Sequence, residues 1–232
     1  MLYDPPCAPR LPRRGPTIAP PKRLQILGER CSGTNFVTEL LRRNLGLELT
    51  ETVGFKHWFV DRRPVPDDVL VVVVERDAHD WLRSLHRKPW HAHPSLHGLS
   101  VAEFARAEWH CVWDDARFGI GPDDPRWGTE MMHERDPRSG RRFANPLAMR
   151  RAKHANWRAV LARAIHGAWL RYDEVASDPH ATLGKIATAC GLELSGTVDP
   201  VMSYKGQGGR PFSPRRYDPL DRETLAHIAQ YE

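Results

Sequence analysis

The sequence predicts an α/β domain in which helices cover both faces of a parallel β-sheet. A short apolar run over residues 23–27 leads into a loop with two glycines and then into a helical pattern. A second run, 69–74, is uninterrupted and mostly β-branched, which is typical of a strand buried on both faces. Strand and helix patterns alternate along most of the chain, and this order favours parallel strands. With 232 residues, the chain has the length of one such domain.

The first half of the domain divides into strand, loop, helix and two further strands. After the strand at 23–27, apolar residues recur at helical spacing up to Leu45, and Gly46 takes the place of a C-terminal cap. The stretch 52–60 alternates well enough to predict a strand that ends near Lys56 and His57. The buried strand at 69–74 follows, and then a helix over 80–87.

The second half is expected to be regular except for the segment 88–145. There, Ser100 and Glu103 form a capping-box pattern that predicts a helix to about Trp113, followed by a long loop. Beyond the segment we expect a helix over 146–165, a buried strand over 167–175, a helix that Asp178 caps, and a last helix from about Asp221. The basic residues of the 146–165 helix are expected to form a solvated face: Arg150, Arg151, Lys153 and Arg158.

Composition excludes several classes of protein. The net charge is +5, without a long basic run or an aromatic-basic alternation, so no nucleic-acid partner is expected. The four cysteines are scattered, which argues against a disulfide framework and a zinc site. No apolar run reaches membrane-spanning length, and the Pro- and Arg-rich stretch 1–22 lacks the apolar region of a signal peptide. We therefore expect a cytoplasmic protein with a disordered tail to about residue 22, whose oligomeric state the sequence does not specify.

The loop "GERCSGTN", residues 28–35, has the pattern of an anion-binding loop. Gly28 and Gly33 have the spacing of a phosphate loop, and a loop between a strand and a helix presents backbone N–H groups to an anion. Thr34 and Asn35 occupy the positions at which a nucleoside triphosphatase carries Lys and Ser/Thr. Magnesium-dependent hydrolysis of ATP or GTP is therefore disfavoured.

A second anion-binding pair follows the buried strand. Arg76 comes at the end of that strand, and Ser84 lies eight residues later in the helix. Ligands of open α/β sheets bind at the carboxyl ends of the strands. An arginine and a serine at this edge fit a second phosphate beside the first.

With these two features the chain resembles the sulfotransferases that use 3′-phosphoadenosine 5′-phosphosulfate (PAPS). That family has a P-loop fold whose loop reads Ser-Gly-Thr after a Lys or Arg, and an Arg and Ser eight residues apart that hold the 3′-phosphate. The stretch Lys205-Gly206-Gln207-Gly208-Gly209 is similar to the family's C-terminal glycine loop. The resemblance covers about 23–87 and 168–210 and is strongest to a bacterial branch of sulfotransferase-like proteins. The resemblance implies that residues 23–232 form one P-loop domain and that 88–145 is an irregular insertion near the acceptor-binding side.

The resemblance implies transfer of a sulfuryl group from PAPS to a hydroxyl or amine, which leaves adenosine 3′,5′-bisphosphate and needs no metal. The loop would hold the 5′-phosphosulfate, Arg76 and Ser84 the 3′-phosphate, and the glycine loop would close over the nucleotide. The residues this assigns to nucleotide binding are Arg30, Cys31, Ser32, Gly33, Thr34, Asn35, Arg76, Ser84, Lys205, Gly206 and Gly209.

Catalysis is where the chain departs from the family. Cys31 occupies the slot of the family's Lys or Arg and supplies no positive charge, so Arg30, one residue earlier, is the expected replacement. His57 is the expected general base because its ordinary pKa lies near neutrality, with Glu29 as the second candidate. Lys56 would share the cationic role, although neighbours on a strand point in opposite directions.

Two other functions remain open. One is a nucleotide- or anion-binding protein without transferase activity, which the neutral Cys31 favours. The other is a small-molecule kinase or NTPase on the same fold, which would require magnesium-dependent binding of ATP.

Overall fold

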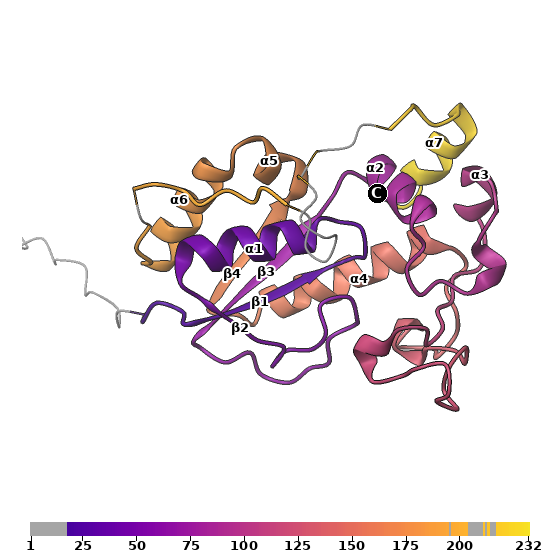
Figure 1. Ribbon diagram of the computed structural model, residues 1–232, viewed down its shortest axis with the longest axis horizontal. Coiled ribbons are helices and arrows are strands. Elements are labelled where there is room, and N and C mark those ends of the chain that lie inside the picture. The colour runs from indigo at the N-terminus through magenta and orange to yellow at the C-terminus, as the bar shows by residue number, and fades with distance from the viewer. Residues whose placement is uncertain (1–17, 195, 204–210, 212, 214–216) are drawn as a thin grey trace, which may run out of the picture.

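The computed structural model describes residues 18–194, 196–203, 211, 213 and 217–232. Its strands are β1 (Arg23–Gly28), β2 (Glu48–Leu49), β3 (Val69–Glu75) and β4 (His166–Arg171). They form one parallel sheet in the order β2-β1-β3-β4 (Figure 1). The expected α/β class with a parallel sheet is confirmed. β3 lies between two neighbours, and its first six residues are buried, as its β-branched sequence predicts.

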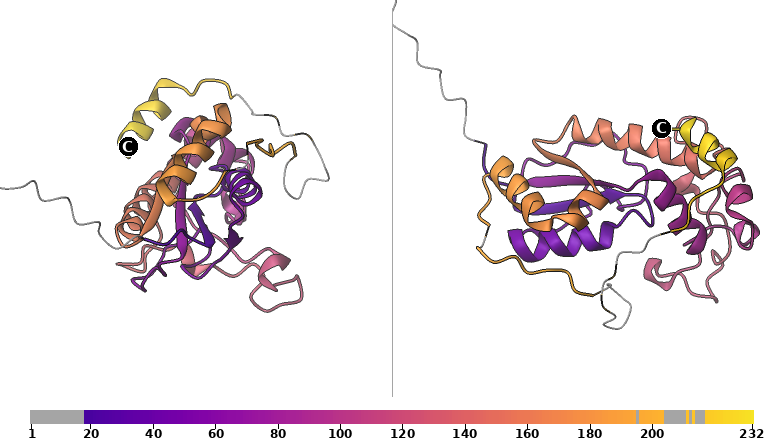
Figure 2. Two further views of the ribbon diagram at one scale, coloured as in Figure 1. Left: turned by 90° about the vertical axis from the view of Figure 1, so that its left-hand side faces the viewer. Right: turned by 90° about the horizontal axis from the view of Figure 1, so that it is seen from above.

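Helices pack on both faces of this sheet (Figure 2). On one face lie α1 (Thr34–Leu45), α5 (Tyr172–Ser177) and α6 (Pro179–Cys190). Their apolar side chains share a core with alternate strand residues, such as Leu24 and Val72. On the other face, Trp157 and Val160 of α4 (Pro146–Leu161) pack on the remaining strand residues. Both faces are therefore buried, and polar side chains can face solvent only at the sheet's ends and edges.

A third group of elements lies beyond the carboxyl ends of the strands (Figure 1). It contains α2 (Ala78–Arg87), α3 (Val101–Phe104), α7 (Arg222–Ala229) and the short 3₁₀ helices at Pro94–Leu96, Ala116–Phe118 and Met132–Glu134. These elements share their own core around Trp81, Phe104 and Trp109. In the part of the chain that the structure describes, no helix is both long and apolar enough to cross a membrane.

Local capping explains where most helices begin and end. Side-chain oxygens of Asp77, Asn145, Asp178 and Asp221 accept hydrogen bonds from backbone N–H groups in the first turns of α2, α4, α6 and α7. Gly46 ends α1 in the left-handed conformation, as predicted.

The strand predicted over 52–60 is wrong: this stretch forms turns. It still runs beside β1, joined by one backbone hydrogen bond, from Gly28 N–H to Lys56 O at 2.9 Å, and by bonds of the Gln25 side chain. The Gln25 amide donates to Gly54 O and accepts from Val53 N–H, at 3.0 and 3.2 Å. A side chain thus replaces part of the backbone ladder that a strand would need, and only the two-residue β2 pairs with this edge.

Three further elements end earlier than predicted, the first being the helix expected over 146–165, which as α4 ends at Leu161. The capping box of Ser100 and Glu103 is present, but its helix α3 stops at Phe104 and not near Trp113. Trp109 instead forms an antiparallel bridge with Phe143, its N–H donating to Phe143 O at 2.9 Å. The stretch 167–175 was predicted as one buried strand. In the structure β4 is a half-covered edge strand that ends at Arg171, and α5 begins at Tyr172.

Candidate functional site

The loop between β1 and α1 needs glycine at positions 28 and 33, because a Cβ at either position would collide with neighbouring atoms. A Cβ on Gly28 would lie 2.7 Å from Thr34 Cγ2 and from Val74 O. Gly33 has φ of +92°, and a Cβ there would lie 2.1 Å from a ring carbon of Tyr172. Cys31 also adopts a left-handed conformation, with φ of +67°. The loop is thus tightly wound and packed under the Tyr172 ring.

This winding leaves backbone donors at the start of α1 without partners. The N-cap residue Gly33 has no side chain to cap the helix, and the first turn contains no acidic residue. Within the described part of the chain, the N–H groups of Gly33, Thr34 and Asn35 have no acceptor. Unpaired N–H groups at a helix N-terminus, where the helix dipole is positive, favour an anion. Left-handed residues in the preceding loop add to such a concavity.

Arg76 brings a poorly satisfied guanidinium to the same loop. Its side chain is 10% exposed and lies 5.2 Å from the ring centre of Tyr172 and 5.6 Å from that of Tyr217. It reaches Cys31 O and Asp80 Oδ2 only at 3.4 Å each. The buried Nε has no hydrogen-bond partner within the described residues. Buried donors are nearly always paired in native proteins, so this guanidinium has unused capacity for an anionic ligand.

Ser84 and Arg76 both approach Cys31. The pKa of the Cys31 thiol is raised, chiefly by burial, although a hydrogen bond with Ser84 and the charges of Arg30 and Arg76 oppose the shift. The thiol is therefore protonated and neutral at neutral pH. Cys31 adds no charge to the loop, but its carbonyl oxygen contacts Arg76, while the indole N–H of Trp81 on α2 donates to the neighbouring Arg30 O at 2.9 Å.

Lys56 and His57 both contact the loop. They lie in a turn and not in a strand, so the opposite orientation of strand neighbours does not apply to them. Lys56 Nζ donates to Asn35 Oδ1 at 2.7 Å. His57 Nδ1 lies 2.7 Å from Gly28 O. A carbonyl oxygen accepts only, so Nδ1 carries the proton and Nε2 holds the lone pair. Burial, followed by the charges of Lys56 and Arg30, lowers the pKa of His57 well below its usual range, so the ring is neutral at neutral pH.

Arg30 and Glu29 point away from this open side. The Arg30 side chain is 4% exposed, and its guanidinium pairs with Glu134 at 2.6 Å. Glu29 is 1% exposed and pairs with His154 and, at 3.4 Å, with Arg150. The positive charge expected at Arg30 is thus turned into the protein interior, and the same holds for the carboxylate of Glu29.

The basic face predicted for α4 is wrong at two of its four positions. Arg150 and Lys153 are buried, with 6% and 1% of their side chains exposed, because they pair with carboxylates behind the loop. Arg151 and Arg158 are exposed, as expected. The sequence gives no indication of Glu134, which lies in a stretch of turns and is 1% exposed.

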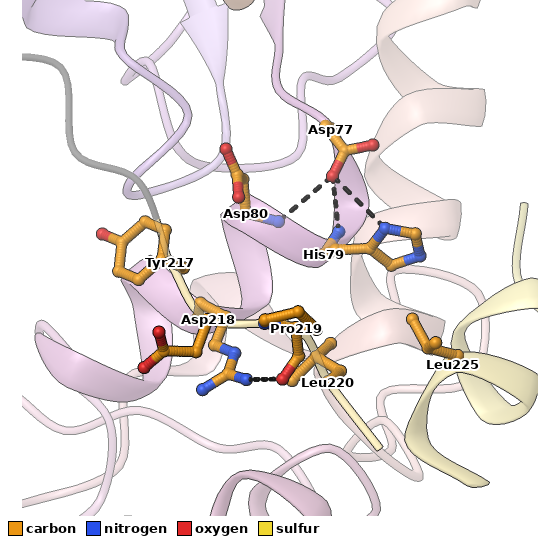
Figure 3. A pocket seen from close by; sticks show the side chains of 9 residues that line it. Asp77, His79, Asp80, Tyr217, Asp218, Pro219, Leu220 and Leu225 are labelled. Carbon is orange, nitrogen blue, oxygen red and sulfur yellow. Dashed lines mark hydrogen bonds and ion pairs between the residues drawn. The ribbon is translucent and has the colours of Figure 1, made fainter. Parts of the chain in front are cut away.

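A pocket of about 370 Å³ lies between the start of α2 and the segment 217–220 (Figure 3). Asp80 and Tyr217, which both contact Arg76, form part of its wall. Its lining contains three carboxylates, of Asp77, Asp80 and Asp218, and one guanidinium, of Arg83, so acidic groups outnumber the arginine and disfavour a phosphate group there. Its lining residues are Asp77, His79, Asp80, Arg83, Tyr217, Asp218, Pro219, Leu220 and Leu225.

The remaining predictions concern metals and the C-terminal glycine loop. Among the described residues, no group of three or more His, Cys, Asp or Glu side chains is arranged to hold a metal ion. His86 and His93 make local loop contacts, and His91 pairs with Asp114. Lys205, Gly206 and Gly209 lie outside the described residues.

Comparisons of the chain with models of protein families, with curated proteins and with solved structures find no match. The function is therefore argued from the geometry of the loop and its neighbours.

Proposed function

We propose that the protein is a P-loop sulfotransferase, which moves a sulfuryl group from PAPS to an acceptor hydroxyl or amine. One observation carries this proposal: unpaired N–H groups at the start of α1 and the under-satisfied guanidinium of Arg76 flank the same residue, Cys31. Two anion-binding features at one loop fit a nucleotide with phosphate groups on two different ribose positions. PAPS and adenosine 3′,5′-bisphosphate are such nucleotides.

The loop suits a sulfuryl donor better than a nucleoside triphosphate. Thr34 stands in place of the lysine that reaches the outer phosphates, and Asn35 in place of the Ser or Thr whose hydroxyl holds magnesium. The transferred sulfuryl group carries less charge than a γ-phosphate. Backbone N–H groups and one cation therefore suffice to hold it.

Lys56 is the better candidate for that cation. Its Nζ already lies at Asn35 on the open side of the loop, whereas Arg30 is engaged with Glu134. In this role Lys56 stabilises the charge that develops on the oxygen between sulfur and the 5′-phosphate as that S–O bond breaks.

His57 supplies a base of the right tautomer. Nδ1–H is held by Gly28 O, so Nε2 is the atom that accepts the acceptor's proton. As the acceptor oxygen or nitrogen attacks sulfur in line, its proton passes to Nε2 and the bisphosphate leaves. The depressed pKa keeps Nε2 unprotonated at neutral pH, although it also makes His57 a weaker base.

A second candidate is a nucleotide-binding protein without turnover. The observation that favours it is the inward turn of Arg30 together with the neutral Cys31, which leaves the loop itself without a cation.

Calorimetric titration with adenosine 3′,5′-bisphosphate, ADP and magnesium-ATP tests the binding half of the proposal. The bisphosphate should bind most tightly. Preference for magnesium-ATP, or no binding of the bisphosphate, would contradict the proposal.

Release of the bisphosphate from PAPS in the presence of phenols, alcohols and amines tests the catalytic half. In His57→Asn the amide N–H can still donate to Gly28 O, so donor binding should remain while release stops. Release at the wild-type rate would place the base elsewhere. Absence of release in the wild type with every acceptor class would favour the binding protein.

A further inference from the structure

Glu134 is the centre of a buried cluster directly behind the loop. Its carboxylate pairs with Arg30 at 2.6 Å and with Lys153. Two neutral groups also donate to Oε2: the indole N–H of Trp109 at 3.1 Å and the thiol of Cys111 at 2.8 Å. Lys153 Nζ further lies 5.9 Å from the ring centre of Phe59.

The charges in this cluster do not balance. Arg30 and Lys153 are two cations, and Glu134 is the one carboxylate that both contact. Burial and the neighbouring carboxylate raise the pKa of the Cys111 thiol well above its usual range, so Cys111 stays neutral. The nearby Glu29 belongs to a separate network: it pairs with His154 and with Arg150, which also contacts Glu75 and Glu232. Arg30, Glu134 and Lys153 by themselves therefore carry one excess positive charge, and a buried charge without its own partner is costly.

The excess charge acts on the loop. Arg30 is itself a loop residue, and His57, which is bonded to Gly28 O, lies within the field of the cluster. Burial is the largest cause of the low pKa of His57, but the charges of Arg30 and Lys153 are among the others. The positive charge of Lys153, on α4, thus acts on His57, whose ring is bonded to the first residue of the loop.

We propose that Arg30, Glu134 and Lys153 form a buried triad whose excess positive charge draws an anion to the loop at 28–35 and replaces the lysine that this loop lacks. The inference rests on the proposed function, since it concerns the same anion site. It assigns Lys153 a role in ligand affinity although the side chain is 1% exposed and belongs to a distant part of the chain.

The triad predicts effects of opposite sign from two substitutions. Lys153→Met removes the excess charge and leaves Arg30 and Glu134 balanced, so affinity for adenosine 3′,5′-bisphosphate should fall while the melting temperature is unchanged or higher. Glu134→Gln leaves two unbalanced cations, so affinity should rise while the melting temperature falls. A cluster that only positions the loop would instead lose affinity in both variants.

The size of the effect follows from Coulomb's law. A unit charge acting across about 10 Å at an effective dielectric constant of about 20 changes a binding constant on the order of tenfold. Lys153→Arg keeps the charge and should keep the affinity. Cys111→Ala removes a neutral donor from Glu134 and should also leave affinity within about twofold. If Glu134→Gln does not fold, Lys153→Met decides: wild-type affinity in that variant would overturn the inference.

The pKa of His57, followed by NMR without ligand, separates this inference from the proposed function. It should rise in Lys153→Met, fall further in Glu134→Gln and stay constant in Cys111→Ala. Failure of the wild type to bind the bisphosphate contradicts the proposed function, and the inference then depends on this titration. An unchanged His57 pKa in Lys153→Met would show that the triad exerts no field at the loop and would overturn the inference.

Discussion

Residues 28–35 divide into a buried half and an open half. Glu29, Arg30 and Ser32 are buried, and the two charged ones each pair with side chains from distant segments. Cys31 and Gly33 are half-buried and Asn35 is exposed, and this side carries the unpaired N–H groups. The difference shows that charge in a loop motif does not by itself identify the ligand-binding residue.

The two halves should respond to different perturbations. The buried half depends on ionised carboxylates, so loss of a carboxylate there should alter the stability of the fold, and the charge of the triad should alter affinity as well. The open half has polar groups that are under-satisfied without ligand, so loss of a ligand-binding side chain there should alter affinity with little change in stability, whereas a change to its backbone conformation should alter stability.

Acid should have the largest effect, and it should act on the buried half. Burial alone would raise the pKa of Glu29, but the charges of His154 and Arg150 prevail and lower it. Arg30 and Lys153 likewise lower the pKa of Glu134 against the effect of burial. Both carboxyls have lower pKa values folded than the value of about 4.3 in an unfolded chain. The stability they contribute is present above that pH and is lost as pH falls through the folded values, so we expect acid unfolding below about pH 4.

Urea denaturation at several pH values measures this dependence. The free energy of unfolding should vary less with pH in Glu134→Gln than in the wild type. Glu103 is an exposed control whose pKa is lowered only by hydrogen bonds with Ser100, so Glu103→Gln should reduce the pH dependence less than Glu134→Gln does. Equal pH dependence in the two variants would contradict the assignment.

Gly33→Ala should be the most damaging single change in the open half. It combines a positive φ with a Cβ placed 2.1 Å from the Tyr172 ring, and we expect a loss of about 2–4 kcal/mol in the free energy of unfolding. Gly46→Ala is the matched control, because φ there is +62° with nothing near the added Cβ. Its cost should be about 1 kcal/mol. Equal costs in urea denaturation would mean that Tyr172 does not constrain the loop.

Arg76→Ala should weaken the bisphosphate complex by about 1.5–3 kcal/mol, the usual worth of a charge-assisted hydrogen bond. The affinity for ADP, which has no 3′-phosphate, should change much less. Titration of both nucleotides measures the contrast. A similar loss for ADP would move the contact of Arg76 to another part of the nucleotide.

Asp80→Asn should have the smallest effect, a gain of about two- to fivefold in affinity for the bisphosphate. Asp80 Oδ2 lies 3.4 Å from Arg76 and competes with the ligand for it, but it is partly exposed and screened by salt. Asp77→Asn removes a neighbouring charge while keeping a residue that caps α2, and should change affinity less. A larger gain from Asp77→Asn would exclude direct competition at Arg76.

The sequence predicted the elements whose signals are local. β1, α1 and β3 follow from apolar runs and from Gly46, and α6 and α7 from the caps at Asp178 and Asp221. Their bounds agree because capping and burial patterns involve neighbouring residues. Arg76 follows β3 at the carboxyl edge of the sheet, and its role with Ser84 in binding a 3′-phosphate stays a prediction.

What the sequence did not predict depends on distant contacts. The alternation at 52–60 resembles that of a strand, but Gln25 takes up its hydrogen bonds with a side chain. The inward turn of Arg30 depends on Glu134, which no local pattern marks. The same applies to Lys153, whose neighbours in sequence suggest a solvated helix face.

The central claim is that the open half of the loop, together with Arg76, binds an anionic nucleotide. Backbone amide NMR during titration with adenosine 3′,5′-bisphosphate tests it most directly. The amide resonances of Gly33, Thr34 and Asn35 should shift strongly, and in Arg76→Ala the same concentrations should produce much smaller shifts. Shifts confined to other parts of the protein, with these three amides unchanged, would contradict the account.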